Sequence, residues 1–265
     1  MRSPPRASSN SVAAAAFFDL DRTLLRRSSA LALAGTFRQR GLISRRQLAS
    51  AAAWQLLFVL RGANHEAVRR AAEDGLILLR GFTPEKMRAL VADAMEPVLR
   101  PLVYAEPLHL VEQHRDRGEP VFIISATLQE IVEAIAEELG FDGALGTVCE
   151  VRGGAYTGHA VRALHAENKA SCLRELAEHR GFDLAECTAY SDSHTDLPFL
   201  EAVGHPVVVN PDRELRRIAG ERGWPILEFG AQAYPHARRR VPPIVWAAGV
   251  LLGAGAAMST RRRGR

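Results

Sequence analysis

An uncharged, apolar run at the start of the chain ends abruptly in two aspartates, Asp19 and Asp21. A short apolar run without helical periodicity predicts a strand buried on both faces, here over Val12–Leu20. Carboxylates at the end of such a strand lie where open α/β sheets bind their ligands. This junction therefore predicts an α/β protein with a polar site at the carboxyl end of its first strand.

Further apolar runs alternate with helical patterns after residue 118. Strands are predicted at Pro120–Ser125, Thr147–Val151, Ala155–Thr157, Cys187–Ser191, Pro206–Asn210 and Pro225–Phe229. Apolar residues at helical spacing predict helices at Thr127–Leu139, Asn168–Arg180 and Asp212–Glu221, and Gly153-Gly154 predicts a hairpin turn. This alternation indicates a mostly parallel sheet covered by helices on both faces.

The alternation breaks between Leu24 and Gly118, where only helical patterns occur. They predict helices at Ser28–Arg40, Ser44–Leu60, His65–Leu79, Thr83–Leu99 and Val103–Arg117, and Thr83 with Pro84 forms a typical helix start. We therefore expect a core domain of residues 12–25 and 118–230, with a helical insertion at 26–117. Residues 1–11 are expected to be disordered.

Charge and cysteine content limit the partners and the cellular compartment. The net charge is +4, but arginines at the two ends of the chain supply much of the excess. The body of the chain has no basic stripe of the kind that would predict nucleic-acid binding. The three cysteines, Cys149, Cys172 and Cys187, form no C-x-x-C pair. They are predicted to be buried, reduced residues of a cytoplasmic protein, and not zinc ligands.

The C-terminal tail, residues 238–265, combines basic clusters with a charge-free run at 241–260. That run is long enough to span a bilayer, which favours attachment to the inner face of the cell membrane. Pro242-Pro243 and the abundance of Ala and Gly argue against a stable span. Basic residues on both sides leave the orientation of this candidate membrane helix open.

Two motifs carry acids and a hydroxyl at predicted strand ends. In F-F-D-L-D-R-T-L, residues 17–24, Asp19 can attack phosphorus and Asp21 can protonate a leaving oxygen. In I-I-S-A-T the hydroxyl of Ser125 can bind phosphate together with nearby helix amides. Alone, the first motif is equally typical of an exposed turn, and Ser125 or Thr127 is more often a simple helix cap.

Two further motifs supply a cation and a second pair of acids. Lys169 is one of only two lysines among many arginines, and its ammonium could offset the charge of a phosphoryl group beside Asp19. Asp192 ends a predicted strand and Asp196 follows it. Asp19, Asp192 and the carbonyl of Asp21 suit Mg²⁺, with Asp196 orienting Asp192 or Lys169.

The four motifs together, in this order, resemble the haloacid dehalogenase-like (HAD) superfamily. The stretches E-V-R-G-G-A-Y-T-G-H and Y-S-D-S-H-T-D-L-P resemble its subfamily IB hydrolases, relatives of phosphoserine phosphatase. The resemblance runs from about Phe17 to Phe229. It implies a Rossmann-like α/β core with an all-helical type 1 cap inserted after the first strand.

The resemblance also implies roles for individual residues. Asp19 is expected to be the nucleophile and Asp21 the acid and base. The expected sets are Ser125, Ala126 and Lys169 for phosphate, Asp19, Asp21 and Asp192 for Mg²⁺, and Thr23, Thr195 and Asp196 as supporting residues.

Three features depart from the phosphoserine phosphatase pattern. That family has a Glu at the start of its cap, where this chain has Ser28, and Gly-Gly after the second motif's Ser, where it has Ala126-Thr127. An Asn usual before the last motif Asp is Thr195. The glutamate that binds the substrate amine in that family is therefore expected to be absent from this chain.

The predicted function is hydrolysis of a small phosphorylated metabolite or a lipid phosphate, with Mg²⁺ and an aspartyl-phosphate on Asp19. A phosphotransferase of the same fold would deliver the phosphoryl group to an alcohol. A membrane-tethered binding protein with a degenerate site would do neither, although the four intact acids argue against it.

Overall fold

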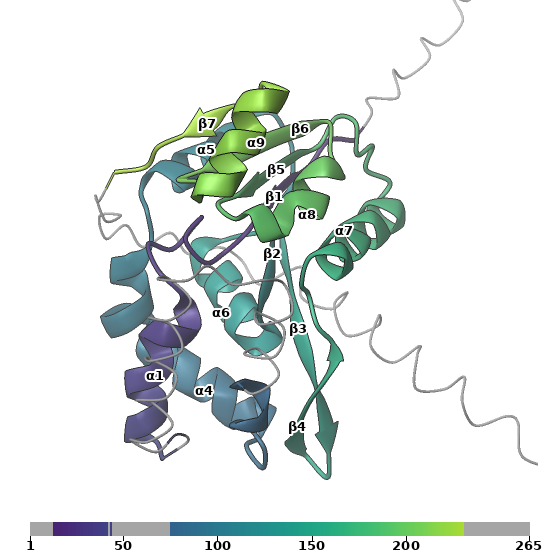
Figure 1. Ribbon diagram of the computed structural model, residues 1–265. Coiled ribbons are helices and arrows are strands. Elements are labelled where there is room, and N and C mark those ends of the chain that lie inside the picture. The colour runs from purple at the N-terminus through teal and green to yellow at the C-terminus, as the bar shows by residue number, and fades with distance from the viewer. Residues whose placement is uncertain (1–12, 42, 44–74, 231–265) are drawn as a thin grey trace, which may run out of the picture.

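The computed structural model describes residues 13–41, 43 and 75–230. They contain a seven-stranded sheet with the strand order β4-β3-β2-β1-β5-β6-β7, parallel apart from the β3–β4 hairpin (Figure 1). The predicted α/β class is therefore confirmed, with β1 at the centre of the sheet. The strands are β1 (Ala16–Phe18), β2 (Val121–Leu128), β3 (Gly143–Arg152), β4 (Ala155–Arg162), β5 (Thr188–Ser191), β6 (His205–Val209) and β7 (Ile226–Leu227).

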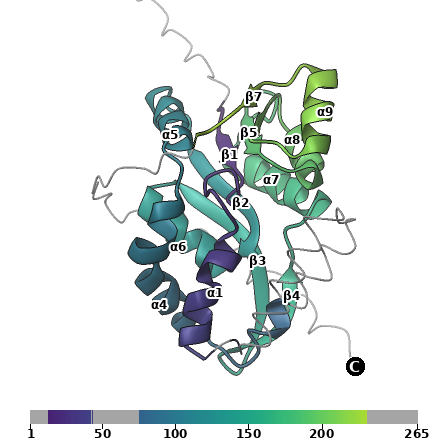
Figure 2. The same ribbon diagram turned by 60° about the vertical axis from the view of Figure 1, so that its left-hand side comes forward.

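Helices cover both faces of this sheet. They are α1 (Ser29–Gln39), α4 (Pro84–Ala94), α5 (Glu106–Asp116), α6 (Gln129–Leu139), α7 (Glu167–Arg180), α8 (Leu197–Glu201) and α9 (Arg213–Arg222). Figure 2 shows α5, α6 and α4 on one side of the strands and α7, α8 and α9 on the other. Covering both faces explains why the strands are apolar throughout instead of alternating.

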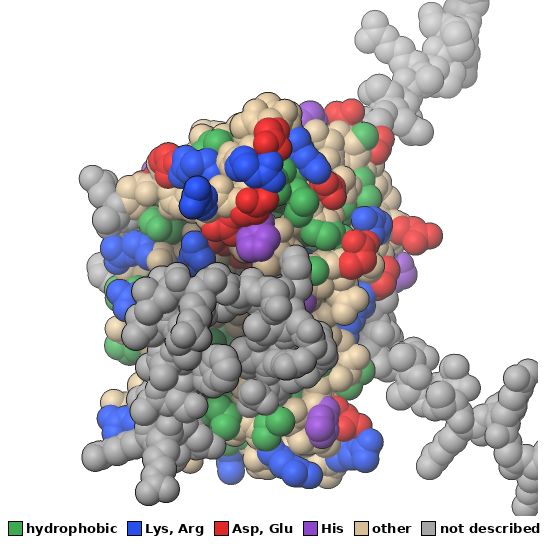
Figure 3. All heavy atoms as spheres, in the orientation of Figure 1, with side chains coloured by type: hydrophobic (Ala, Val, Ile, Leu, Met, Phe, Trp, Pro, Cys, Tyr) green, Lys and Arg blue, Asp and Glu red, His purple; other side chains and the backbone are tan. Residues whose placement is uncertain are grey.

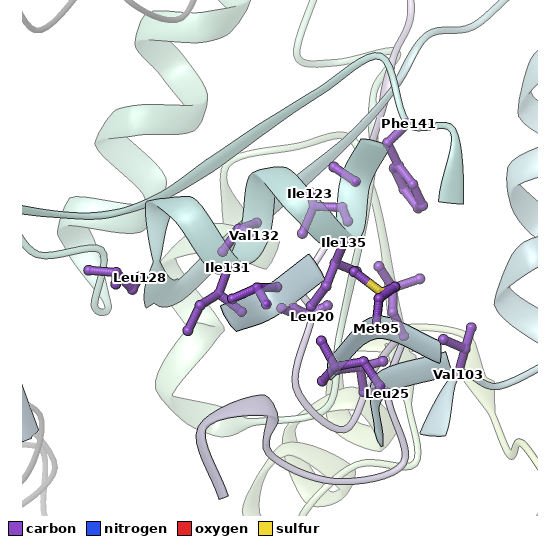
Figure 4. Close-up of a cluster of buried hydrophobic side chains, with 14 of the residues drawn as sticks. Leu20, Leu25, Met95, Val103, Ile123, Leu128, Ile131, Val132, Ile135 and Phe141 are labelled. Carbon is purple, nitrogen blue, oxygen red and sulfur yellow. The ribbon is translucent and has the colours of Figure 1, made fainter. Parts of the chain in front are cut away.

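Neighbouring residues of β1 enter two different hydrophobic cores. Phe18 packs with residues of α4, α5 and α6, whereas Phe17 packs with residues of α7, α8 and α9. This follows from the strand geometry, because successive side chains point to opposite faces. Figure 4 shows the first core, where Ile131 and Ile135 of α6 point toward Leu20. Both ends of the junction around Asp19 are thus held by buried apolar contacts.

Helix α4 begins as predicted but ends earlier, whereas α5 begins at Glu106, three residues after the predicted Val103. Thr83 caps α4 by accepting a hydrogen bond from the Lys86 N–H at 3.3 Å, and Pro84 occupies the first turn. The regular helix stops at Ala94 and continues as a π-helical segment, Met95–Leu99, instead of running to Leu99. Pro97 lies in this segment, and its missing N–H removes one α-helical hydrogen bond.

The second strand is longer than predicted. β2 continues through Leu128 with a register shift after Ile124, so α6 begins at Gln129. Leu128 occupies the N-cap position without a side-chain hydrogen bond, and neither Ser125 nor Thr127 caps the helix. β3 also begins earlier than expected, at Gly143, because glycines and alanine hide strand character at residues 143–146.

Helix α5 falls inside the predicted insertion, yet it packs against the sheet. The His114 Nε2 atom lies 2.8 Å from the Tyr190 hydroxyl, and the His114 ring meets the Phe18 ring edge-on, with centroids 6.1 Å apart. The Phe18 and Tyr190 rings stack with centroids 4.3 Å apart. Helix α5 therefore supports the two strands that lead to Asp19 and Asp192.

Several predictions concern residues outside the described part of the chain. These are the disordered segment 1–11, the helix Ser44–Leu60, most of the helix His65–Leu79 and the tail 238–265. The division into a core and an insertion at 26–117 stays a prediction for the same reason. In the part that the structure describes, no helix has the length and apolar character needed to cross a membrane. The candidate membrane helix at 241–260 remains untested.

Gly204 is expected to tolerate no side chain. A Cβ atom there would lie 1.8 Å from the main-chain oxygen of Ala185, which cannot move aside like a flexible side chain. We expect Gly204→Ala to lower the free energy of unfolding by about 2–3 kcal/mol in urea denaturation. The control is Gly220→Ala in the exposed part of α9, which meets nothing within 4 Å and should gain up to about 1 kcal/mol. Equal effects of the two variants would contradict this assignment.

Candidate active site

The sheet topology brings three of the predicted site residues to one edge. β1 lies between β2 and β5, and all three strands run in the same direction. The Asp19 N–H donates to the Tyr190 carbonyl oxygen at 2.9 Å, so Asp19 extends the pairing just past the end of β1. Ser125 lies near the end of β2, and Asp192 follows β5 directly. All three are almost fully buried.

Lys169 connects this edge with the last motif. Its Nζ atom donates to Asp19 Oδ1 at 2.5 Å and to Asp196 Oδ2 at 2.6 Å. The side chain is only 1% exposed, extends from the first turn of α7 and places its ammonium 4.6 Å from the centre of the Phe199 ring. Asp196 Oδ2 also accepts the Ser191 hydroxyl at 2.7 Å. The ammonium is thus shared by two carboxylates in an enclosed position.

Burial sets the ionisation of this cluster. It raises the pKa of Asp19 to about 7, and the positive charge of Lys169 opposes that rise. Burial alone would lower the pKa of Lys169, but the Asp19 and Asp196 carboxylates outweigh it, so the pKa lies above its ordinary value. The lysine therefore stays charged, while Asp19 becomes a carboxylate near neutral pH.

Asp192 carries an oxygen with unused bonding capacity. Its side chain is buried, and Oδ2 accepts no hydrogen bond, although the Arg22 Nε atom lies 3.1 Å away. Burial raises the pKa of Asp192 well above its ordinary value, with Arg22 opposing the rise. Arg22 itself has a φ of +66°, unusual for a residue with a side chain. Sequence reasoning did not identify Arg22, because arginine between two motif positions carries no distinctive signal.

These donors fit a hard divalent cation. The second oxygen of Asp19, Oδ2 of Asp192 and the carbonyl of Asp21 are all oxygens, which Mg²⁺ prefers. Across the described residues no group of three or more His, Cys, Asp or Glu side chains is arranged to hold a metal. A Mg²⁺ site does not require one, since two carboxylates, a carbonyl and water suffice. The buried Asp192 oxygen, which accepts no hydrogen bond, is the observation that favours such a site.

Asp21 lies in the loop after β1, and its carboxyl group contacts the first turn of α1. Its Oδ1 atom accepts the Ser29 N–H at 2.8 Å, and its Oδ2 atom accepts the Thr127 hydroxyl at 3.4 Å. Burial raises the pKa of Asp21, whereas the hydrogen bonds from Ser29, Ser28 and Thr127 oppose that rise. A raised pKa suits a group that must donate a proton. The sequence marked Ser28 and Thr127 as departures from a family pattern but offered no signal for Ser29.

The remaining predicted residues occupy supporting positions. The Ser125 oxygen accepts the Thr127 N–H at 3.2 Å, which leaves the hydroxyl proton available for another acceptor. The Ala126 carbonyl accepts the Thr147 hydroxyl at 2.7 Å. Thr23 is fully buried, and its hydroxyl oxygen has no partner. The Thr195 hydroxyl pairs with the Ser193 hydroxyl at 3.0 Å, so its contacts are local to the loop after β5.

Asp212 fixes that loop and was missed by sequence reasoning, which placed it inside a helix. It is the N-cap of α9, where its Oδ1 atom accepts the Leu215 N–H at 2.8 Å. Its Oδ2 atom lies 2.9 Å from both the main-chain nitrogen and the Nδ1 atom of His194. Its N–H donates to the Asp192 carbonyl at 2.9 Å. Asp212 therefore holds the main chain at both Asp192 and His194.

Known proteins are similar to this chain in sequence and in fold. The family model described as haloacid dehalogenase-like hydrolase matches residues 16–201. A probable phosphatase of Mycobacterium tuberculosis is 43% identical over 215 residues, covering 81% of this chain and 75% of the relative. A phosphoserine phosphatase of the same organism is 38% identical over 254 residues, covering 95% and 82%. A Bordetella pertussis structure of unknown function, 28% identical, superposes with a TM-score of 0.72 over 82% of this chain and 99% of that one.

Removing the buried ammonium should destabilise the protein. Lys169→Met leaves Asp19 and Asp196 facing each other without a counter-charge, and we expect it to cost about 3–5 kcal/mol of unfolding free energy at neutral pH. The matched control is Lys86→Met, which removes the other lysine from an exposed position on α4. Denaturant unfolding of both variants checks this, and equal stability of the two would contradict the role of the ion cluster.

The raised pKa of Asp19 predicts a pH-dependent stability. Between the unfolded value of 3.8 and the folded value of about 7 the native state holds the extra proton, so stability falls as pH rises through this window. In chelator-treated protein we expect wild type to lose more unfolding free energy than Asp19→Asn between about pH 5 and about pH 8. The difference should be at most a few kcal/mol, at about 1.4 kcal/mol per pKa unit. Parallel pH profiles for the two proteins would contradict the assignment.

Proposed function

The chain belongs to the haloacid dehalogenase-like hydrolase family and is a phosphatase, and we propose that it cleaves phosphomonoesters through an aspartyl-phosphate on Asp19. The observation that carries this proposal is the buried Lys169 ammonium, which joins Asp19 and Asp196 at the carboxyl end of the central strand. A lone buried carboxylate would repel a phosphate. A carboxylate with one oxygen held by an ammonium can face a phosphate with its other oxygen.

The first step follows from this geometry. Lys169 holds Oδ1 of Asp19, so Oδ2 is the oxygen that attacks phosphorus. The bond between phosphorus and the leaving oxygen breaks, and protonated Asp21 donates its proton to that oxygen. We propose that the Ser125 hydroxyl and the amides near the start of α6 bind the phosphoryl oxygens. The products are a free alcohol and a phosphoryl group bonded to Asp19.

The second step reverses the role of Asp21. Now a carboxylate, it accepts a proton from a water molecule that attacks the phosphorus. The bond between phosphorus and the Asp19 oxygen breaks, which releases inorganic phosphate and restores the carboxylate. Asp21 ends the cycle protonated, so protons balance over the two steps.

We propose Mg²⁺ as the cofactor, held by Asp19, Asp192 and the main-chain carbonyl of Asp21. When bound, the cation offsets the negative charge of the phosphoryl group. The buried Oδ2 atom of Asp192, which accepts no hydrogen bond, supports this assignment. Asp196 orients the site through Lys169, and Asp212 holds the Asp192 main chain.

The proposed substrate is a small phosphorylated metabolite or a lipid phosphate. One relative is named a phosphoserine phosphatase and another a histidinol-phosphatase, so the names of the relatives refer to phosphates of different small alcohols. A panel of phosphoserine, histidinol phosphate and a short-chain lipid phosphate tests the class. Transfer of the phosphoryl group to an added alcohol in preference to water would identify a phosphotransferase instead.

Asp19→Asn is expected to abolish turnover of p-nitrophenyl phosphate by at least about a thousandfold, because the amide cannot form the acyl phosphate. Colour release with added Mg²⁺ measures the rate. The control is Asp93→Asn, which changes an exposed aspartate paired with Arg40 and should leave the rate unchanged.

Two outcomes would contradict the proposal. Substantial turnover by Asp19→Asn would remove Asp19 as the nucleophile. No turnover by wild type on any phosphate, together with no adduct on Asp19 after incubation with beryllium fluoride, would favour the non-catalytic binding protein.

A further inference from the structure

We propose that Ser29 and Thr127 form a hydroxyl pair that positions Asp21 as the acid for poor leaving groups. The proposal rests on the proposed function and deepens it, because it assigns two positioning residues to that site. Both residues lie beyond the motif positions assigned above. The pair joins the first helix of the insertion to the end of β2.

Two hydrogen bonds reach the Asp21 carboxyl group, and a third contact joins the two hydroxyls. The Ser29 N–H donates to Oδ1 at 2.8 Å, and the Thr127 hydroxyl donates to Oδ2 at 3.4 Å. The Ser29 and Thr127 hydroxyl oxygens lie 3.2 Å apart. Ser29 is completely buried. Oδ1 is therefore held by the main chain of α1 and Oδ2 by the end of β2, and the Ser28 hydroxyl also hydrogen-bonds to this carboxyl group.

The chemistry of these partners decides which oxygen carries the transferred proton. A main-chain N–H can only donate, so Oδ1 is held as an acceptor throughout the cycle. A threonine hydroxyl can either donate or accept, so it tolerates both the carboxylate and the carboxylic acid at Oδ2. When the Thr127 hydroxyl rotates to accept from protonated Oδ2, it keeps its own proton and donates it to the Ser29 hydroxyl oxygen, 3.2 Å away. The geometry thus assigns the transferred proton to Oδ2.

A simple capping role does not explain the pair. The N-cap of α1 is Ser28, whose hydroxyl accepts the Leu31 N–H at 3.5 Å. The helix α6 that follows Thr127 begins at Gln129 without a side-chain cap. The contact between Ser29 and Thr127 joins residues 98 positions apart and meets the Asp21 carboxyl group. What Ser29 and Thr127 have in common is therefore their contact with Asp21, and not a role as a helix cap.

The Thr127 bond is long for a hydrogen bond between two oxygens, whose usual length is about 2.7–2.8 Å. Contacts of this kind often shorten only when substrate is bound. The orientation of Asp21 therefore depends on α1 and the end of β2 both being in place. The hydroxyl pair joins these two elements beside the Asp21 carboxyl group.

Leaving-group chemistry offers a readout that a purely structural role would not produce. A nitrophenolate leaves without a proton, whereas an alkoxide requires one in the transition state. Misplacing the acid should therefore harm alkyl phosphates far more than aryl phosphates. Loss of phosphate binding or of fold would harm both alike.

The experiment compares kcat/KM for p-nitrophenyl phosphate, phenyl phosphate and glycerol phosphate in the full-length protein with Mg²⁺. For Thr127→Val and Ser29→Ala we expect losses of about 10–100-fold on glycerol phosphate and much smaller losses on p-nitrophenyl phosphate. Thr127→Ser should restore most of the alkyl phosphate activity, because it keeps the hydroxyl. The matched control is Thr157→Val, which removes a hydroxyl bonded to Glu150 in the β3–β4 hairpin and should change nothing.

A double-mutant comparison separates the failure of this inference from the failure of the proposed function. In an Asp21→Asn background Thr127→Val should add little, because the acid that it positions is already absent. Equal losses on all three substrates, or full additivity with Asp21→Asn, would overturn the hydroxyl pair and leave the phosphatase intact. Turnover that survives Asp19→Asn would instead overturn the proposed function itself.

Discussion

The arrangement of the site depends on one buried cation, the ammonium of Lys169 between Asp19 and Asp196. Moving such charges out of water costs several kcal/mol per ion, and well-packed apolar residues often stabilise a protein equally well or better. Stability alone is therefore a weak reason for burying it. The proposed function explains the cluster better, because in that mechanism the ammonium occupies one Asp19 oxygen and leaves the other free to attack phosphorus.

The sheet determines where this cluster can form. β1 is only three residues long, but it is central and its side chains enter two separate cores. Asp19 is therefore anchored from both faces, and the parallel neighbours deliver Ser125 and Asp192 to the same edge. Helix α5 packs against the strands and contributes the hydrogen bond between His114 and Tyr190.

Charged side chains on the surface of the molecule pair with each other instead. Figure 3 shows basic and acidic side chains mixed over α9, where Arg217 and Glu214 form an ion pair.

The fold class and the cluster around Asp19 could be predicted because their signals are local. Fully apolar strands indicate a covered parallel sheet, and each motif stands at a strand or helix end whose direction is known. The partners of Asp21 could not be predicted in this way. Ser29 and Thr127 lie 98 residues apart, and serine or threonine near a helix start is usually a cap. Strand β2 also runs on through Thr127, and propensity alone does not distinguish this extended backbone from the first turn of a helix.

Four residues depart from the phosphoserine phosphatase pattern: Ser28, Ala126, Thr127 and Thr195. Asp19, Ser125, Lys169 and Asp192, which would handle the phosphoryl group and the metal, all match the pattern. Ser28 and Thr127 do not, and both hydroxyls act on the Asp21 carboxyl group. In the proposed mechanism Asp21 protonates the leaving oxygen, so two of the four altered positions contact the group that would lie beside the alcohol. We therefore expect this chain to differ from phosphoserine phosphatases in the alcohol part of its substrate.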